Sequence, residues 1–220
     1  MNFKRIDWSN DFKRVGSYPQ VQSRSLSSNS EADGFIGKFI LQKAPLDAII
    51  PTGILHKKAK FTDLISASAQ GFSLNLLVSE RLGKILAASA HYGIQFFETS
   101  VILPSQEHEK CSLLHPYAFG YSFIDYKKSE FIFMDAKDNK KQKAEINSIE
   151  EILNYKFPYK TIKESGKSLW ISKLHLIDNI DIDFFALNLL PSGGIGFFVS
   201  ETLENFIIQN EMSGFKFVEI

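Results

Sequence analysis

The sequence predicts an α+β fold in which a mixed or mostly antiparallel sheet carries three to five helices. The chain has 220 residues, including 20 phenylalanines and 7 tyrosines, and aromatic side chains are typical of strands. Short apolar runs alternate with segments of helical spacing that begin at a serine. One short motif occurs twice, which indicates two similar units. We expect a single domain over residues 35–220, after an irregular or partly mobile segment at residues 1–34.

The first third of the chain predicts two strands and one helix. Ser17–Asp33 is polar and rich in serine, as is typical of a loop. The apolar run Phe35–Gln42 predicts the first strand. Phe61–Gln70 predicts a short helix that ends at Gly71, because glycine tolerates the backbone of a helix C-terminus. Leu74–Val78 predicts a short strand.

A helix should follow this strand directly. Ser79 stands at the N-cap position, where its hydroxyl can accept a hydrogen bond from a free amide of the first turn. Glu80 then lies where the helix dipole favours a negative charge. We expect Gly93 to end the helix and Ile94–Ile102 to form the next strand.

The middle of the chain is predicted to be mostly β. The connection Asp135–Lys143 is polar, and Ser148–Phe157 predicts a helix with a capping box in which Glu151 reaches back to the helix start. The segment Asp181–Leu190 fits a strand or a helix equally well. Strands are expected at three places: Tyr117–Tyr126, Glu130–Met134 and Ser168–Ile177.

The C-terminal part predicts a second strand–helix–strand unit. Ile195–Val199 should be a strand, Ser200 an N-cap and Glu201–Met212 a helix. Gly214 should close that helix, and Phe215–Ile220 should form the last strand.

The two serine junctions share a sequence motif. VSERL at Val78–Leu82 returns as VSETL at Val199–Leu203, and a glycine, a phenylalanine and a glutamate follow each copy at the same spacing: Gly93, Phe96 and Glu98, then Gly214, Phe217 and Glu219. A repeated strand–Ser–helix–Gly–strand unit explains the match; the alternative is that two unrelated units follow the same capping rules. Both interpretations give Ser79 and Ser200 a structural role, because a nucleophilic serine at such a turn prefers small neighbours.

Charge and composition limit the classes of partner. Lysine plus arginine equals aspartate plus glutamate, at 25 each, so we expect neither nucleic acid nor a membrane as partner. Cys111 is the single cysteine, which excludes an internal disulfide and suits a reducing compartment. The N-terminal residues lack the apolar core of a signal peptide, and no apolar run approaches the ~20 residues of a membrane helix. A cytoplasmic protein is therefore expected.

No motif for catalysis or metal binding stands out. The histidines do not form an H-E-x-x-H pattern; they are His56, His91, His108, His115 and His175. Asp178, Asp181 and Asp183 do not fit a calcium loop, which needs glycine at its sixth position and glutamate at its twelfth. Pro191–Gly196 (PSGGIG) lacks the G-K-[ST] ending of a phosphate loop and precedes a strand, so we interpret it as a turn. We predict no catalytic residue, no metal and no cofactor.

Longer stretches of the chain resemble a known family. They include FTDLISASAQGFSLNLLVSERLGKIL, GIQFFETSVIL, FIDYKKSEF and FFVSETLENFIIQNEMSGFKFVEI. Together they resemble immunity proteins of bacterial polymorphic toxin systems, in the branch related to a myxobacterial immunity protein. The resemblance covers roughly Phe61–Ile220. It implies a cytoplasmic protein that binds and neutralises a cognate protein toxin by occlusion, without a cofactor or a reaction.

Two other classes of function stay open at this point. A small hydrolase-like enzyme is possible if the fold brings His115, Asp125, His175 or Cys111 together. A structural or interaction module in a larger assembly is the third class. Asp125 and Ser129 also belong to the resemblance, but we interpret them as a turn in which the aspartate bonds the backbone that follows it.

Overall fold

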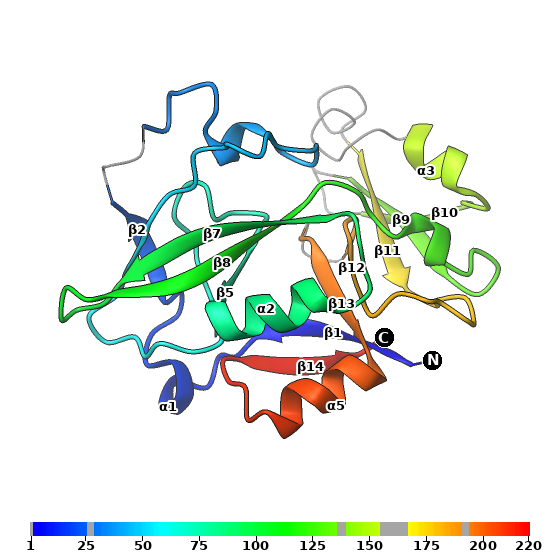
Figure 1. Cartoon of the computed structure of the whole chain (residues 1–220). Coiled ribbons are helices and arrows are strands. Elements are labelled where there is room, and N and C mark those ends of the chain that lie inside the picture. The colour runs from blue at the N-terminus through cyan, green and yellow to red at the C-terminus, as the bar shows by residue number, and fades with distance from the viewer. Residues whose placement is uncertain (1, 26–28, 136–139, 155–166, 191–193) are drawn as a thin grey trace.

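The fold contains three β-sheets and, among the described residues, four α-helices (Figure 1). The computed structural model describes residues 2–25, 29–135, 140–154, 167–190 and 194–220. The helices are α1 (Phe12–Val15), α2 (Glu80–Ala88), α3 (Ile149–Asn154) and α5 (Glu201–Gln209), and two 3-10 turns are η1 (Ile36–Lys38) and η2 (Tyr121–Phe123).

Two of the sheets are mixed, and the three-stranded sheet is antiparallel. The five-stranded sheet has the order β14 (Phe215–Glu219), β1 (Phe3–Trp8), β13 (Gly196–Ser200), β12 (Phe184–Leu187) and β6 (His91–Tyr92). The six-stranded sheet has the order β2 (Val21–Arg24), β3 (Gly53–Leu55), β7 (Ile94–Ile102), β8 (His108–Pro116), β5 (Leu76–Ser79) and β4 (Leu64–Ile65). The three-stranded sheet has the order β10 (Lys141–Ala144), β9 (Glu130–Asp135) and β11 (Lys167–Lys173). Parallel pairing joins β6 to β12 and β3 to β7, and the other named strand pairs are antiparallel. The predicted α+β class with mixed sheets is therefore confirmed.

The strands β12 and β13 of the five-stranded sheet are buried on both faces. Along β12, Phe184 belongs to one hydrophobic core and its neighbour Phe185 to another. Along β13, Phe197 and Phe198 divide between the same two cores. Because every residue of both strands is buried, this sheet needs a covering layer on each face. The ambiguity of Asp181–Leu190 has the same origin, since a strand buried on both faces shows no alternation of apolar and polar residues.

Different elements cover the two faces. The three-stranded sheet and α3 cover one face, through side chains such as Phe131, Ile171 and Ile152. The other face packs against α2, α5 and the six-stranded sheet, with Leu82 and Leu203 occupying matching positions in the two helices. A third core lies on the far face of the six-stranded sheet, where residues of η1 and the loops after it are buried.

The expectation of an irregular segment at residues 1–34 is wrong for much of that segment. Phe3–Trp8 forms β1, which pairs with β13 on one side and β14 on the other. Phe3 and Ile6 bury their side chains in the two cores that flank the sheet. The charged residues Lys4, Arg5 and Asp7 made this segment look unlike a buried strand in the sequence. In the structure, Lys4 forms ion pairs with Glu204 and Glu219.

Two further predictions in the first third of the chain fail because tertiary contacts override local preference. Phe61–Gln70 contains β4 rather than a helix: the buried Gln20 side chain bonds both Thr62 Oγ1, at 2.9 Å, and the Ser66 amide, at 2.9 Å, and so holds this segment extended. Phe35–Gln42 contains the 3-10 turn η1 rather than a strand, since Ile36 and Phe39 contact the same core at a spacing of three.

The prediction of strands in the middle is partly wrong. Tyr117–Tyr126 contains η2 instead of a strand, and its Gly120 amide donates to the carbonyl of Ala186. The strand β8 was not predicted, because it begins with the charged residues His108–Lys110 and ends at Pro116. It pairs along its whole length with β7, which was predicted. The strands β9 and β11 and the helix α3 begin within one residue of their predicted starts. The strand β11 ends at Lys173 rather than Ile177, and residues 155–157 of the predicted helix lie outside the described part of the chain. Glu151 of the predicted capping box accepts from the amide of Asn147.

Gly93 and Gly214 have a different role from the one predicted. Neither ends a helix: α2 ends at Ala88 and α5 at Gln209. Both glycines have positive φ, 70° and 94°, and both stand directly before a strand. A Cβ at Gly93 would collide with the carbonyl oxygen of Ala118, and one at Gly214 with that of Leu64. Each glycine therefore allows a close approach of two backbone segments.

The buried central sheet leads to a stability prediction. Phe198→Ala should lower the free energy of unfolding by about 3–5 kcal/mol, because the ring is fully buried between layers. Phe206→Ala is the control, since 48% of that residue is exposed, and it should change the free energy by less than about 1 kcal/mol. Urea unfolding measures both values. Equal effects of the two substitutions would contradict the assignment of the core.

Candidate functional site

The two serine junctions have the same hydrogen-bond geometry. Ser79 Oγ accepts from the amide of Leu82 at 3.3 Å and donates to Asp63 Oδ1 at 2.7 Å. Ser200 Oγ accepts from the amide of Leu203 at 3.2 Å and donates to Asp183 Oδ1 at 2.6 Å. The prediction that both serines are N-caps is therefore confirmed.

Each aspartate also binds its serine through the main chain. The amide of Ser79 donates to the carbonyl of Asp63 at 2.8 Å, and the amide of Ser200 donates to that of Asp183 at 2.8 Å. Each aspartate stands immediately before a strand, β4 or β12, that pairs with the strand ending at the serine. We call this arrangement, made by Asp63 with Ser79 and by Asp183 with Ser200, the aspartate–serine clasp. The clasp joins the start of one strand, β4 or β12, to the start of the helix that follows the paired strand, β5 or β13.

The first clasp carries additional partners. Arg81 binds the Asp63 carboxylate with two nitrogens, at 2.5 and 2.7 Å, and the amide of Ser213 donates to Asp63 Oδ2 at 2.8 Å. Burial alone would raise the pKa of Asp63, but the hydrogen bonds from Arg81, Ser79 and Ser213 hold it below its ordinary value. The carboxylate therefore stays ionised, and it ties the segment after α5 to the start of β4.

Neither serine hydroxyl is placed as a nucleophile. Ser79 shares a depression of about 410 Å³ with His108, but its hydroxyl already donates to Asp63 and accepts from the helix amide. Ser200 is fully buried. A nucleophilic serine would need its hydroxyl bonded to a general base and open to a substrate.

The residues proposed for an enzyme site do not gather in one place. Cys111 and His115 lie four residues apart on β8, in the six-stranded sheet, and different cavities reach them. Burial raises the pKa of the Cys111 thiol to about 12, which keeps it protonated. His115 bonds the side chain of Asn75 and the carbonyl of Gln42, both at 2.8 Å, and burial lowers its pKa.

Asp125 and His175 meet elsewhere, beside the three-stranded sheet. The amide of Asp125 donates to the carbonyl of His175 at 2.8 Å, and Ser129 bonds the backbone of His175. The carboxylate of Asp125 accepts from the amides of Lys127 and Lys128, as predicted for a turn. These contacts join the backbone of His175 to the turn that contains Asp125 and Ser129.

The remaining candidates give no metal site in the part of the chain that the structure describes. In those residues, no three His, Cys, Asp or Glu side chains are placed to hold an ion. Of the DNIDID residues, Asp183 belongs to a clasp. In PSGGIG, residues 191–193 lie outside the described part of the chain, and Gly196 opens β13. No described helix is both long enough and apolar enough to cross a bilayer.

The two motif helices form one surface. The helices α2 and α5 line a shallow depression of about 390 Å³, with Ile85 on one side and Phe206 on the other. Phe206 is 48% exposed, and Lys84, which also lines the depression, forms an ion pair with Glu80 at 3.0 Å. We call the surface made by Ile85, Ala88, Thr202 and Phe206 the helix-pair face.

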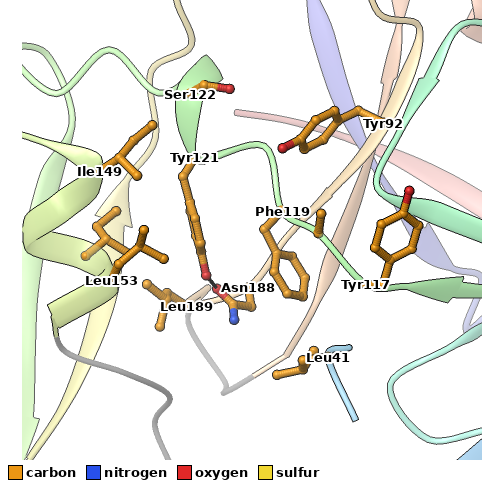
Figure 2. Close-up of a pocket in the computed structure, with 12 residues that line it drawn as sticks. Leu41, Tyr92, Tyr117, Phe119, Tyr121, Ser122, Ile149, Leu153, Asn188 and Leu189 are labelled. Carbon is orange, nitrogen blue, oxygen red and sulfur yellow. Dashed lines mark hydrogen bonds between the residues drawn. The ribbon is translucent and has the colours of Figure 1, made fainter. Parts of the chain in front are cut away.

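A larger cavity of about 630 Å³ lies between α3, η2 and the edge strand β6 (Figure 2). Its aromatic walls are Tyr92, Tyr117, Phe119 and Tyr121. Its aliphatic walls are Leu41, Ile149, Ile152, Leu153 and Leu189. Asn188 lies within it and accepts a hydrogen bond from the hydroxyl of Tyr121. We call this space the aromatic cavity.

The sequence predicted the serines but not their partners. Asp63 and Asp183 precede their serines by 16 and 17 residues, and each stands before two apolar residues, Leu-Ile or Phe-Phe. That shared spacing was the one available signal. The aromatic cavity left no signal, because its walls come from five separate segments of the chain.

Comparisons with known proteins leave the family undetermined: no protein-family model matches the chain, and no curated protein matches it.

The clasps can be tested by removing each hydroxyl. Ser79→Ala and Ser200→Ala should each lower the free energy of unfolding by about 1–3 kcal/mol, because a helix loses its cap and an aspartate carboxylate loses a donor. Ser105→Ala is the control, since this exposed serine bonds a neighbouring side chain within one loop. Thermal or urea unfolding measures the losses. Two variants as stable as the control would show that the clasps contribute little.

Proposed function

We propose that the chain is an immunity protein that binds a cognate protein toxin and neutralises it by occlusion. The proposal rests first on the resemblance of Phe61–Ile220 to such proteins. The observation that carries it in the structure is the helix-pair face. The two copies of the motif, far apart in the sequence, meet there as neighbouring helices that present apolar side chains to solvent.

The chemistry of this face suits a protein partner. Phe206 is an aromatic side chain that is 48% exposed, and aromatic residues in a central depression often dominate binding energy. The charged residues Lys84 and Asp183 also line the depression, and they resemble the polar rim of an interface. The helices are fixed by the clasps, so little conformational entropy would be lost on binding.

We also propose that the two strand–Ser–helix–Gly–strand units are copies of one repeated unit. Three matched features support this beyond the sequence. Each serine is clasped by an aspartate that begins the neighbouring strand. Each glycine lies five positions after its helix and approaches a backbone carbonyl. The segment after each helix also accepts a hydrogen bond from the strand that precedes the other unit. Ala90, after α2, accepts from Phe184, and Ser213, after α5, accepts from Leu64.

The reciprocal contacts support a local pseudo-two-fold relation between the proposed units. The amide of Leu64 donates to the carbonyl of Ser213 at 3.0 Å, and the amide of Phe184 donates to that of Ala90 at 3.0 Å. In each case the first residue of a strand donates a hydrogen bond to the loop that follows the helix of the other unit. Such an arrangement brings the equivalent helices α2 and α5 to the same face.

The proposed function can be tested by co-expression with the toxin encoded by the neighbouring gene. The tagged chain should co-purify with the toxin and restore growth. Phe206→Asp should weaken the complex roughly thirtyfold or more, because a charge would be buried at the centre of the contact. Leu153→Asp is the matched control, since Leu153 is 53% exposed, lies on a helix and borders the aromatic cavity instead. Its complex should be unaffected.

The outcomes separate two claims. Failure of the wild-type pair to associate, together with no protection of the cells, would contradict the immunity function. Association that survives Phe206→Asp but is lost in Leu153→Asp would retain the function and move the contact away from the helix-pair face.

A further inference from the structure

The aromatic cavity is large enough for a small organic molecule. Its volume is about 630 Å³, whereas a cavity of about 150 Å³ already accepts benzene. Ligand sites usually measure about 300–1,000 Å³ and combine apolar walls with a few placed polar groups. Most of the walls here are aromatic rings and aliphatic side chains, so the cavity has the size and the lining of such a site.

One polar side chain within the cavity has an unused donor. Asn188 is 7% exposed, and its Oδ1 accepts from the hydroxyl of Tyr121. Its amide nitrogen points away from Tyr121, into the cavity (Figure 2), and has no hydrogen-bond partner among the residues that the structure describes. Because this N–H group faces the cavity without a protein acceptor, a ligand that supplies an acceptor can form a hydrogen bond there.

The donor is held in a fixed orientation. Burial raises the pKa of Tyr121, so its hydroxyl stays protonated and donates to Asn188. That bond uses the amide oxygen and leaves the nitrogen facing the cavity. Two walls of the cavity are also held in strained backbone, because Leu41 and Leu189 have φ values of 57° and 64°. Such conformations recur at ligand sites, where the surrounding structure holds them in place.

The lining also limits the charge of a ligand. None of the described residues around the cavity is a lysine, arginine, histidine, aspartate or glutamate. An ionised ligand would lose its hydration without gaining an opposite charge. A neutral molecule avoids this cost.

We propose that the aromatic cavity binds a small uncharged molecule with an aromatic or alicyclic body and one carbonyl-type acceptor, which takes the hydrogen bond of Asn188 Nδ2. The site is independent of the proposed toxin contact, because the helix-pair face and the cavity are lined by different residues. The ring stacks among Tyr92, Phe119 and Tyr121, and the acceptor lies beside Asn188.

Two probes of nearly the same shape test the proposal. Acetophenone carries a carbonyl, and cumene has a methyl-bearing carbon in its place. Dissociation constants are measured by chemical-shift titration of the purified chain, with shifts followed for Tyr121 and Leu153. Wild-type protein should bind both probes at this site. Asn188→Leu should weaken acetophenone about threefold to tenfold and leave cumene unchanged or slightly tighter.

A second variant protects the test from a folding defect. Asn188→Leu leaves the Tyr121 hydroxyl without an acceptor, whereas Tyr121→Phe together with Asn188→Leu removes both partners of the buried bond and should preserve the fold. The double variant should show the same selective loss of acetophenone. Absence of binding by both probes to the wild type would overturn the proposal, and so would equal acetophenone affinity in wild type and double variant.

Discussion

Burial of both faces of the five-stranded sheet is the constraint on which the rest of the fold depends. Strands β12 and β13 contain no residue that can face water, so the sheet is stable only between two layers. The three-stranded sheet with α3 supplies one layer, and the helices α2 and α5 with the six-stranded sheet supply the other. The first strand, β1, must also insert between β13 and β14 to complete the sheet, which makes the chain start part of the core.

The clasps solve a problem that this layering creates. Each buried strand that ends at a serine turns directly into a helix, and the first amides of that helix would otherwise lie unpaired against the core. One hydroxyl serves the helix amide while it also binds the aspartate of the neighbouring strand. The serines of the repeated motif thus serve the structure of the fold. The helix-pair face and the aromatic cavity are the surfaces that we propose for binding.

Local signals predicted what local forces determine. The N-caps Ser79 and Ser200, the acidic first turns and the strand after each glycine follow from capping and spacing, and they were predicted. The failures occur where distant residues decide. Gln20 holds Phe61–Ser66 extended against its helical composition, and β1 is recognisable only from its two neighbours. The aromatic cavity could not be predicted, because Asn188 and Tyr121 meet across 67 residues and neither carries a motif.

Amide hydrogen exchange under native conditions tests the central constraint most directly. If both covering layers depend on the five-stranded sheet, the amides of β12 and β13 should exchange only through global unfolding, with a free energy equal to that measured in urea. The amides of the three-stranded sheet should exchange at that free energy or below it. Exchange of β12 and β13 through a smaller opening, while β7 and β8 stay protected, would contradict the account.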